Sequence, residues 1–259
     1  MKKVAVKNNH PAMSEKKKNV LIISGAILFV IFMVLMAFLT YFLKSYCATS
    51  EAKQFLKSDD DVSVVNENDY YTFSPKKVER GLVFYQGMKV ENIAYAPLMY
   101  HFAKDTNTFC ALINAPLNFP LFNINGAHQP ISKHSEIKNW YVAGHSLGGT
   151  IASIYASKHL SELKGLIMLG AYTNANLSEA HLKVAEIYGD QDGVMNRASY
   201  EKSQAILPSD KMEHIIIDGN HSGFGMYGEQ YRDGIAKISK IDQIKETVNF
   251  CQEFFTKSE

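Results

Sequence analysis

Cysteine is scarce in this sequence, and its few copies are scattered. The three cysteines are Cys47, Cys110 and Cys251. Their odd number and wide spacing exclude a disulfide framework and a cysteine-based metal cluster. Cys110 lies in an apolar stretch typical of a strand and Cys251 on the apolar side of a predicted helix, so we expect both to be small core residues. Only Cys47 is left as a candidate for a link between two chains.

An excess of either charge is also missing. The 259 residues include 27 lysines and arginines against 26 aspartates and glutamates, which gives a net charge of +1. This balance argues against a nucleic-acid partner, which requires a basic surface. The chain also lacks a cofactor motif and a metal-ligand cluster, and its glycine-rich turn at residues 144–149 lacks the Lys-Ser/Thr ending of a phosphate-binding loop. We therefore expect neither a cofactor nor a metal.

One long uncharged run is present near the N-terminus. Residues 20–43 contain no charged side chain, and as a helix they would be about 36 Å long, enough to cross a bilayer. Six lysines lie within the first eighteen residues, against the single acid Glu15. Because lysines beside a span stay on the cytoplasmic side, we expect a single-pass protein of the cell membrane. Its N-terminus would be cytoplasmic and the rest of the chain outside.

The alternative is a secreted protein, released by signal cleavage near Ser50. Residues 48–50 are small enough for cleavage, but the apolar run is longer than the roughly 7–15 residues usual in a signal peptide. We therefore divide the chain into four parts. These are a basic cytoplasmic tail (1–19), a transmembrane helix (20–43), a juxtamembrane linker (44–61) and one folded domain (62–259).

The remainder of the chain alternates strand-like and helix-like segments. Residues 62–65 and 70–73 flank a polar four-residue turn and predict a hairpin. Further strands are expected at residues 81–86, 109–113, 140–143, 166–169, 184–188 and 214–217. Helices are expected after Pro97, after residue 146 and over residues 242–255, and a loop with one short helix over 118–137. This pattern indicates a mostly parallel sheet, covered by helices on both faces, with the hairpin as an antiparallel edge.

The most informative stretch is GHSLGG at residues 144–149, which lies between an apolar strand and a helix. It places Ser146 at the apex of a G-x-S-x-G pattern. A serine hydroxyl becomes a nucleophile only when it is held clear of the backbone beside a base. The tight turn that exposes such a serine requires glycine where a Cβ would collide with neighbouring atoms.

This strand–GHSLGG–helix unit, in an alternating chain opened by a hairpin, resembles the α/β-hydrolase fold family. The resemblance covers residues 62–259 and implies an α/β-hydrolase domain with a triad in the order Ser, acid, His. It implies Ser146 as nucleophile and His221, in the glycine-rich loop after the last strand, as base. The acid is expected in the turn GDQDG at residues 189–193. We choose Asp192, three residues past the glycine, over Asp190.

The resemblance also implies a pair of backbone N–H donors for an oxyanion. One is Leu147, directly after the nucleophile, and the other is Met88, in the loop after the third strand. Where the family often has His-Gly, this chain has Gln-Gly at residues 86–87. Three apolar residues beside the proposed base either line an acyl-binding site or pack beneath the last helix. They are Phe224, Met226 and Tyr227.

These features predict a membrane-anchored serine hydrolase that acts outside the cytoplasm on the ester bond of a small-molecule or lipid-like substrate. A thioester or an amide is the chemical alternative. About 46 residues separate Ser146 from Asp192, which leaves no room for a cap domain, so we expect an open pocket. The alternative function is a catalytically silent domain that serves in binding or scaffolding. The complete set of triad residues argues against it.

Overall fold

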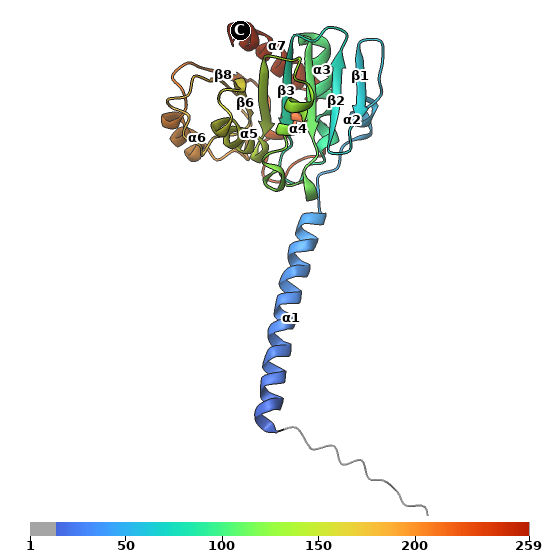
Figure 1. The fold of residues 1–259 in the computed structure, drawn as a ribbon, viewed down its shortest axis with the longest axis vertical. Helices are drawn as coiled ribbons and strands as arrows, with labels where there is room; N and C mark the ends of the chain where they lie inside the picture. The colour runs from blue at the N-terminus through green and yellow to red at the C-terminus, as the bar shows by residue number, and fades with distance from the viewer. Residues whose placement is uncertain (1–13, 259) are drawn as a thin grey trace, which may run out of the picture. The chain divides into compact units, whose positions relative to one another are not determined.

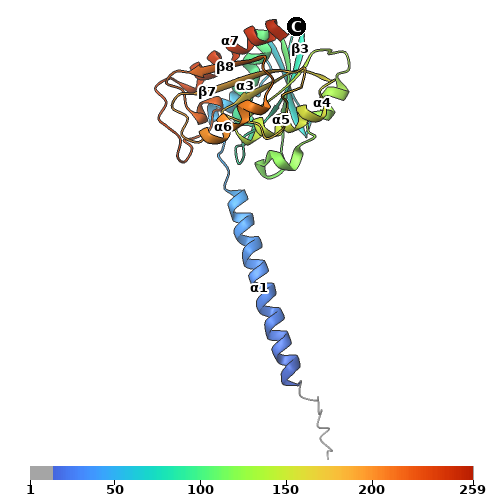
Figure 2. The same cartoon turned by 90° about the vertical axis from the view of Figure 1, so that its left-hand side faces the viewer.

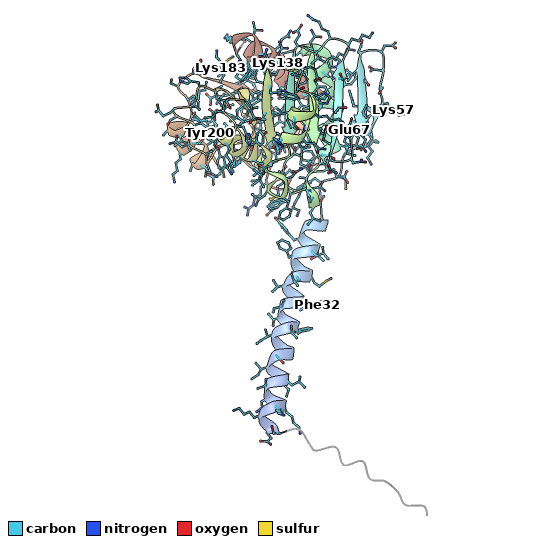
Figure 3. All side chains as sticks on the ribbon, viewed as in Figure 1. Phe32, Lys57, Glu67, Lys138, Lys183 and Tyr200 are labelled. Carbon is cyan, nitrogen blue, oxygen red and sulfur yellow. The ribbon has the colours of Figure 1, made fainter. Side chains whose placement is uncertain are left out.

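The computed structural model describes residues 14–258 and divides the chain into two compact units, residues 1–44 and 45–259. In the first unit, helix α1 (Glu15–Leu43) has the length and composition of a membrane-spanning helix, which a signal sequence near an N-terminus would share. Figure 3 shows its side chains projecting outward, Phe32 among them. The helix predicted at residues 20–43 is therefore present. Most of the predicted basic tail, residues 1–19, lies outside the described residues.

The second unit is built on an eight-stranded sheet with the strand order β1-β2-β4-β3-β5-β6-β7-β8 (Figure 1). The strands are β1 (Val62–Asn66), β2 (Tyr70–Pro75), β3 (Arg80–Tyr85), β4 (Thr108–Ile113), β5 (Trp140–His145), β6 (Leu163–Leu169), β7 (Lys183–Gly189) and β8 (Lys211–Ile216). Strand β2 is antiparallel to both of its neighbours, whereas all pairs from β4 to β8 are parallel. The predicted sheet with an antiparallel edge hairpin is confirmed.

Helices cover both faces of this sheet, as predicted. Helices α3 (Ala96–Thr106) and α7 (Lys240–Ser258) pack on one face, and α4 (His128–Lys133) and α5 (Leu147–Lys158) on the other (Figure 2). Alternate strand residues feed the two cores: Leu82 and Phe84 of β3 join the α3/α7 side, and Val83 and Tyr85 the α5 side. Burial on both faces explains why the inner strands β3, β4 and β5 are mostly apolar along their whole length.

The shorter helices lie in the connections. They are α2 (Ser50–Gln54), α6 (Arg197–Ser203) and five 3₁₀ turns, η1 (Asn92–Tyr95), η2 (Pro116–Asn118), η3 (Pro120–Asn123), η4 (Gln204–Ile206) and η5 (His221–Phe224). The apolar side predicted for the last helix is buried on α7, with Ile244, Val248 and Cys251 at its centre. Cys110 is also buried, as expected, while Cys47 is exposed.

The folded unit begins earlier than the sequence predicts. A linker is expected over residues 44–61, but the compact unit starts at Ser45. Tyr46 and Ala48 form isolated β-bridges with two segments far along the chain, and Ala52 is fully buried. This stretch is short and polar, so its composition resembles that of a linker. Its contacts are with residues distant in the sequence, and no local pattern predicts them.

Candidate active site

Ser146 lies at the sharp turn between β5 and α5. Its backbone angles, φ 54° and ψ −126°, are sparsely populated by residues other than glycine and cost about 1–3 kcal/mol. A Cβ on Gly144 would lie 2.3 Å from the backbone of Gly148, and a Cβ on Gly148 would lie 2.2 Å from the carbonyl oxygen of Tyr85. The two glycines therefore permit the turn, which holds a half-buried Ser146 at the carboxyl edge of the sheet.

Asp192 and His221 face each other from the loops that follow β7 and β8. The Asp192 Oδ2 lies 2.8 Å from the His221 Nδ1, and both side chains are shielded from solvent. The other carboxylate oxygen of Asp192 accepts the backbone N–H groups of Val194 and Met195 at 2.9 and 2.8 Å. Burial alone would raise the pKa of Asp192, but the hydrogen bond and charge of His221 and these amides outweigh burial and lower it.

The alternative acid, Asp190, has a different environment. It is exposed, and its Oδ1 accepts the backbone N–H of Asp218 at 2.7 Å. The structure therefore brings Asp192 rather than Asp190 to the predicted base, because the turn after β7 sends the two side chains to different partners.

Ser146 and His221 line one pocket of about 180 Å³. Its other lining residues are Leu147, Thr150, Gly170, Ala171, Tyr172, Val194, Met195 and Asn196. Within residues 14–258 the His221 Nε2 has no hydrogen-bond partner, which leaves this nitrogen available to accept a proton. Gly170, with φ 51°, packs against the pair: a Cβ there would lie 2.9 Å from the His221 Nδ1.

A second histidine supports this arrangement, and nothing in the sequence pointed to its contact with the first. His145 is buried, with its ring centroid 4.4 Å from that of His221. Its Nδ1 lies 2.7 Å from the hydroxyl of Tyr95, and that hydroxyl accepts the N–H of Gly87 at 3.1 Å. Burial lowers the pKa of His145 well below its ordinary value, and the charge of His221 adds to this effect. The Tyr95 hydroxyl thus links His145, at the elbow, to the loop after β3.

The loop that carries His221 is held from two sides. The Asp233 carboxylate accepts the backbone N–H groups of His221 and Ser222 at 3.1 and 2.7 Å. The Lys240 ammonium, at the start of α7, donates to the carbonyls of Ser222 and Tyr227 at 3.0 and 2.8 Å. Burial lowers the pKa of Lys240 to about 8, although the nearby Asp233 and Glu229 oppose the shift. Backbone groups on both sides of the ring are thereby fixed.

Of the residues predicted to bind the oxyanion or the substrate, only one lines the pocket that contains Ser146 and His221. Leu147 lines the pocket, whereas Met88 lies in the loop after β3 and does not line it. Phe224 and Tyr227 are buried in the α3/α7 core, and Met226 packs against that core. None of these three lines the pocket, so the acyl-site interpretation is corrected to packing near α7, the second role considered for them. The pocket wall near His221 is formed instead by segments 170–172 and 194–196.

No cluster of three or more His, Cys, Asp or Glu side chains within residues 14–258 is arranged to hold a metal ion. Between β6 and β7, the connection over residues 170–182 contains neither helix nor strand. The pocket is therefore bordered by this loop and by the turn after β7, with no inserted domain between Ser146 and Asp192.

Comparisons with known proteins agree with this fold. The profile described as "Alpha/beta hydrolase family" matches residues 81–245, from β3 into α7. A search of curated proteins found no significant match. Similar solved structures include carboxyl esterase 2 from the fungus Tuber melanosporum, at 10% identity and a TM-score of 0.56 over 83% of this chain and 91% of that one. A soluble variant of monoglyceride lipase from Saccharomyces cerevisiae is 13% identical, with a TM-score of 0.52 over 78% and 96% of the two chains. At these identities the likeness concerns the fold.

Proposed function

Since this chain belongs to the alpha/beta hydrolase family, we propose that it is a serine hydrolase that cleaves carboxylic esters by acyl transfer to water. One observation carries the proposal. The Asp192–His221 pair, 2.8 Å apart, borders the same pocket as Ser146, which sits on a strained strand-to-helix turn. Strain of this kind persists where the surroundings over-determine it, and a nucleophile at a turn apex is such a place.

Each residue has a role in this mechanism. The Ser146 hydroxyl attacks the ester carbonyl carbon while the His221 Nε2 accepts its proton. Asp192 keeps the other proton of the imidazole on Nδ1 and stabilises the cation that forms. His221 then gives its proton to the departing alcohol. In the second half of the reaction the same nitrogen takes a proton from a water molecule, whose oxygen attacks the acyl carbon, and returns that proton to the Ser146 oxygen as the acid is released. The N–H groups of Leu147 and Met88 would stabilise the oxyanion, and loss of one such donor costs about 3 kcal/mol.

A fluorophosphonate probe tests the nucleophile. The purified wild-type chain should be labelled and should hydrolyse p-nitrophenyl acetate, whereas Ser146→Ala should lose both properties with an unchanged circular dichroism spectrum. Ser222→Ala serves as the control, because Ser222 is also a loop serine but is buried beside Asn220. A folded wild-type protein that takes up no probe would contradict the proposal and favour a silent binding domain.

The size of the pocket limits the substrate. Its volume of about 180 Å³ is close to the ~150 Å³ of a cavity that holds benzene, and below the ~300–1,000 Å³ of pockets for drug-sized ligands. We therefore infer that it takes a short acyl group. In a panel of p-nitrophenyl esters, kcat/KM should be highest for acetate to butyrate and fall for longer chains. Met195→Ala should move the optimum to longer chains, and a wild-type optimum at octanoate or beyond would refute this inference.

We also infer that α1 anchors the enzyme in the cell membrane, with the N-terminus cytoplasmic and residues 45–259 outside. The support is the uncharged stretch of α1, which is long enough to span a bilayer and follows Lys16, Lys17 and Lys18 in the same helix. Cleavage near Ser50 would remove Tyr46 and Ala48, which bridge to Val90 and Tyr227 within the folded unit. Retention of the helix preserves these contacts, so we prefer the anchored form to the secreted one.

A further inference from the structure

Exposed apolar side chains gather around the segment with which the folded unit begins. We call Met88, Leu117, Leu121 and Tyr231 the apolar rim, and their exposed fractions are 38, 46, 46 and 77%. They come from three loops that follow strands β3, β4 and β8. Apolar side chains scattered singly over a surface need no explanation, so the inference depends on what connects these four.

Asn118 connects the first two loops to the start of the folded unit. Its side-chain amide donates to the hydroxyl of Ser45 at 3.0 Å, and its side-chain oxygen accepts from the Gln86 amide at 3.1 Å. Its backbone carbonyl accepts the N–H of Lys89 at 2.6 Å. Lys89 in turn accepts, through its carbonyl, the N–H of Tyr46 at 2.7 Å. Residues 45–46, the loop after β3 and the loop after β4 therefore form one hydrogen-bonded unit.

Tyr46 brings the third loop to the same place. Its hydroxyl accepts the backbone N–H of Tyr231 at 3.4 Å. The Arg232 guanidinium lies 5.3 Å from the centroid of the Tyr231 ring. A tyrosine ring is apolar and its hydroxyl is polar, and the neighbouring guanidinium is charged. Such a combination suits the boundary between lipid and water.

Chain connectivity adds the decisive constraint. Only Lys44 separates the last residue of α1 from Ser45, and a chain spans at most about 3.6 Å per residue. A bilayer that holds α1 therefore keeps Ser45 within about 7 Å of the end of that helix. The loops bonded to residues 45–46 are kept close to the same bilayer surface.

The loop after β4 also holds an apolar side chain outward in a strained backbone conformation. Leu117 has a φ of 55°, in the left-handed region that an apolar side chain rarely adopts, and it remains exposed. Beside it, Phe119 and Phe122 pack edge to face with their centroids 5.0 Å apart. The next turn, η3, carries Leu121 and contacts α5, the helix that starts next to Ser146. The rim loops and Ser146 all follow the carboxyl ends of parallel strands, so they lie at the same edge of the sheet.

We propose that the apolar rim rests on the surface of the bilayer into which α1 inserts. This inference depends on the anchoring proposed above. The carboxyl edge of the sheet, which carries the rim loops and also the Ser146 pocket, would then face lipid. A site in this position would act on esters that combine a short acyl group with an alcohol apolar enough to partition into the bilayer. Such esters reach the site without crossing bulk water.

Tryptophan substitution tests the contact directly. The chain has one native tryptophan, Trp140, which is buried. Full-length Leu121→Trp and Tyr231→Trp variants are reconstituted in phosphatidylcholine vesicles with or without brominated acyl chains. Both should lose fluorescence in the brominated lipid. The matched control is Leu160→Trp, which is 40% exposed and lies in the turn before β6, at the opposite edge of the parallel sheet, and should keep its fluorescence.

The outcomes separate this inference from the anchor. Protein that resists alkaline carbonate washing but shows no bromine quenching at residues 121 and 231 would overturn the docking surface and leave the anchor intact. Protein that leaves the vesicles would overturn the anchor itself. Fluorescence changes that grow with protein concentration in lipid-free detergent would assign the rim to a second copy of the chain, which also refutes docking on lipid.

An activity ratio gives an independent measure. Leu121→Asp should lower hydrolysis of a long-chain alkyl acetate carried in vesicles, relative to hydrolysis of water-soluble p-nitrophenyl acetate by the same variant. Leu160→Asp should leave this ratio at the wild-type value. An equal fall of the ratio in both variants would show a general loss of stability and contradict the proposal.

Discussion

At the scale of single residues, two aspartates in one turn have different environments and should differ in function. Asp192 meets His221, whereas Asp190 is exposed and accepts the N–H of Asp218. We expect Asp192→Asn to lower kcat for p-nitrophenyl acetate by about 10⁴-fold, because the amide favours the wrong imidazole tautomer. Asp190→Asn, the matched control, should retain most of the activity. The reverse ranking would show that the acid had been assigned two residues too late.

His145 provides a test by pH. Its pKa lies well below its ordinary value because the ring is buried, with Tyr95 as its hydrogen-bond partner and with His221 and Lys240 as nearby bases. The native state therefore binds fewer protons than the unfolded chain, in which a histidine titrates near 6.5. The free energy of unfolding should fall as pH drops below about 6.5, by up to ~1.4 kcal/mol per pH unit from this residue.

The variant His145→Asn isolates this contribution, since its amide oxygen still accepts from the hydroxyl of Tyr95 while the side chain does not titrate. Urea unfolding of both proteins at neutral and mildly acidic pH gives the two slopes. The free energy of unfolding should fall more steeply with decreasing pH in the wild type than in the variant, so the difference between the two proteins should become smaller. Parallel slopes would mean that His145 keeps an ordinary pKa in the native state.

The predictability of the site differs from residue to residue. Ser146 and Asp192 each follow a buried strand and His221 follows the edge strand β8, and all three lie in glycine-containing turns, a local pattern that sequence reasoning detects. Tyr172 and Met195 line the pocket only because two loops meet in space, and neither has a local signal. The same limit explains the correction for Phe224 and Tyr227, whose apolar character fits a core as well as a pocket.

At the scale of elements, the first segment of the folded unit has a testable role. Tyr46 and Ala48 bridge to β-like segments, Phe55 packs edge to face on Tyr100 at 5.2 Å, and Ala52 is fully buried. A soluble fragment that starts at Ser45 should unfold cooperatively in urea. A fragment that starts at residue 62 should be less stable by roughly 2 kcal/mol or more, the usual cost of losing one buried apolar side chain. Equal midpoints and slopes for the two fragments would restore the interpretation of residues 45–61 as a linker.

The strands could be predicted because each is a short apolar run bounded by turn residues, and the observed bounds differ from the expected ones by only a few residues. The connection over residues 114–137 resisted this reasoning. Its shape depends on two consecutive left-handed residues, Leu117 and Asn118, and on hydrogen bonds to Gln86 and Ser45. Leucine has no preference for such a conformation, so only the tertiary contacts could reveal it.

At the scale of the whole molecule, the distribution of charge is the basis for the proposed orientation of the chain in the membrane. The lysines at residues 16–18 precede the uncharged part of α1, and the folded unit follows it. The full-length protein should stay in the membrane fraction after alkaline carbonate washing, and protease added outside intact cells should digest residues 45–259. Recovery of a soluble form that begins near Glu51 would instead demonstrate signal cleavage.

The same lysines allow a stricter version of the test. Orientation follows the lysine and arginine content of the residues that flank a span, and acidic residues contribute little to it. Replacement of Lys16, Lys17 and Lys18 by glutamine should therefore leave the protein in the membrane but protect a fraction of the molecules from external protease. Replacement of Lys57, Lys76 and Lys77, which lie in the folded unit, removes equal charge and should change nothing, because lysines on the far side of the span oppose the predicted orientation. Full digestion of both variants would show that another feature orients the chain, and the cytoplasmic placement of the N-terminus would lose its physical basis.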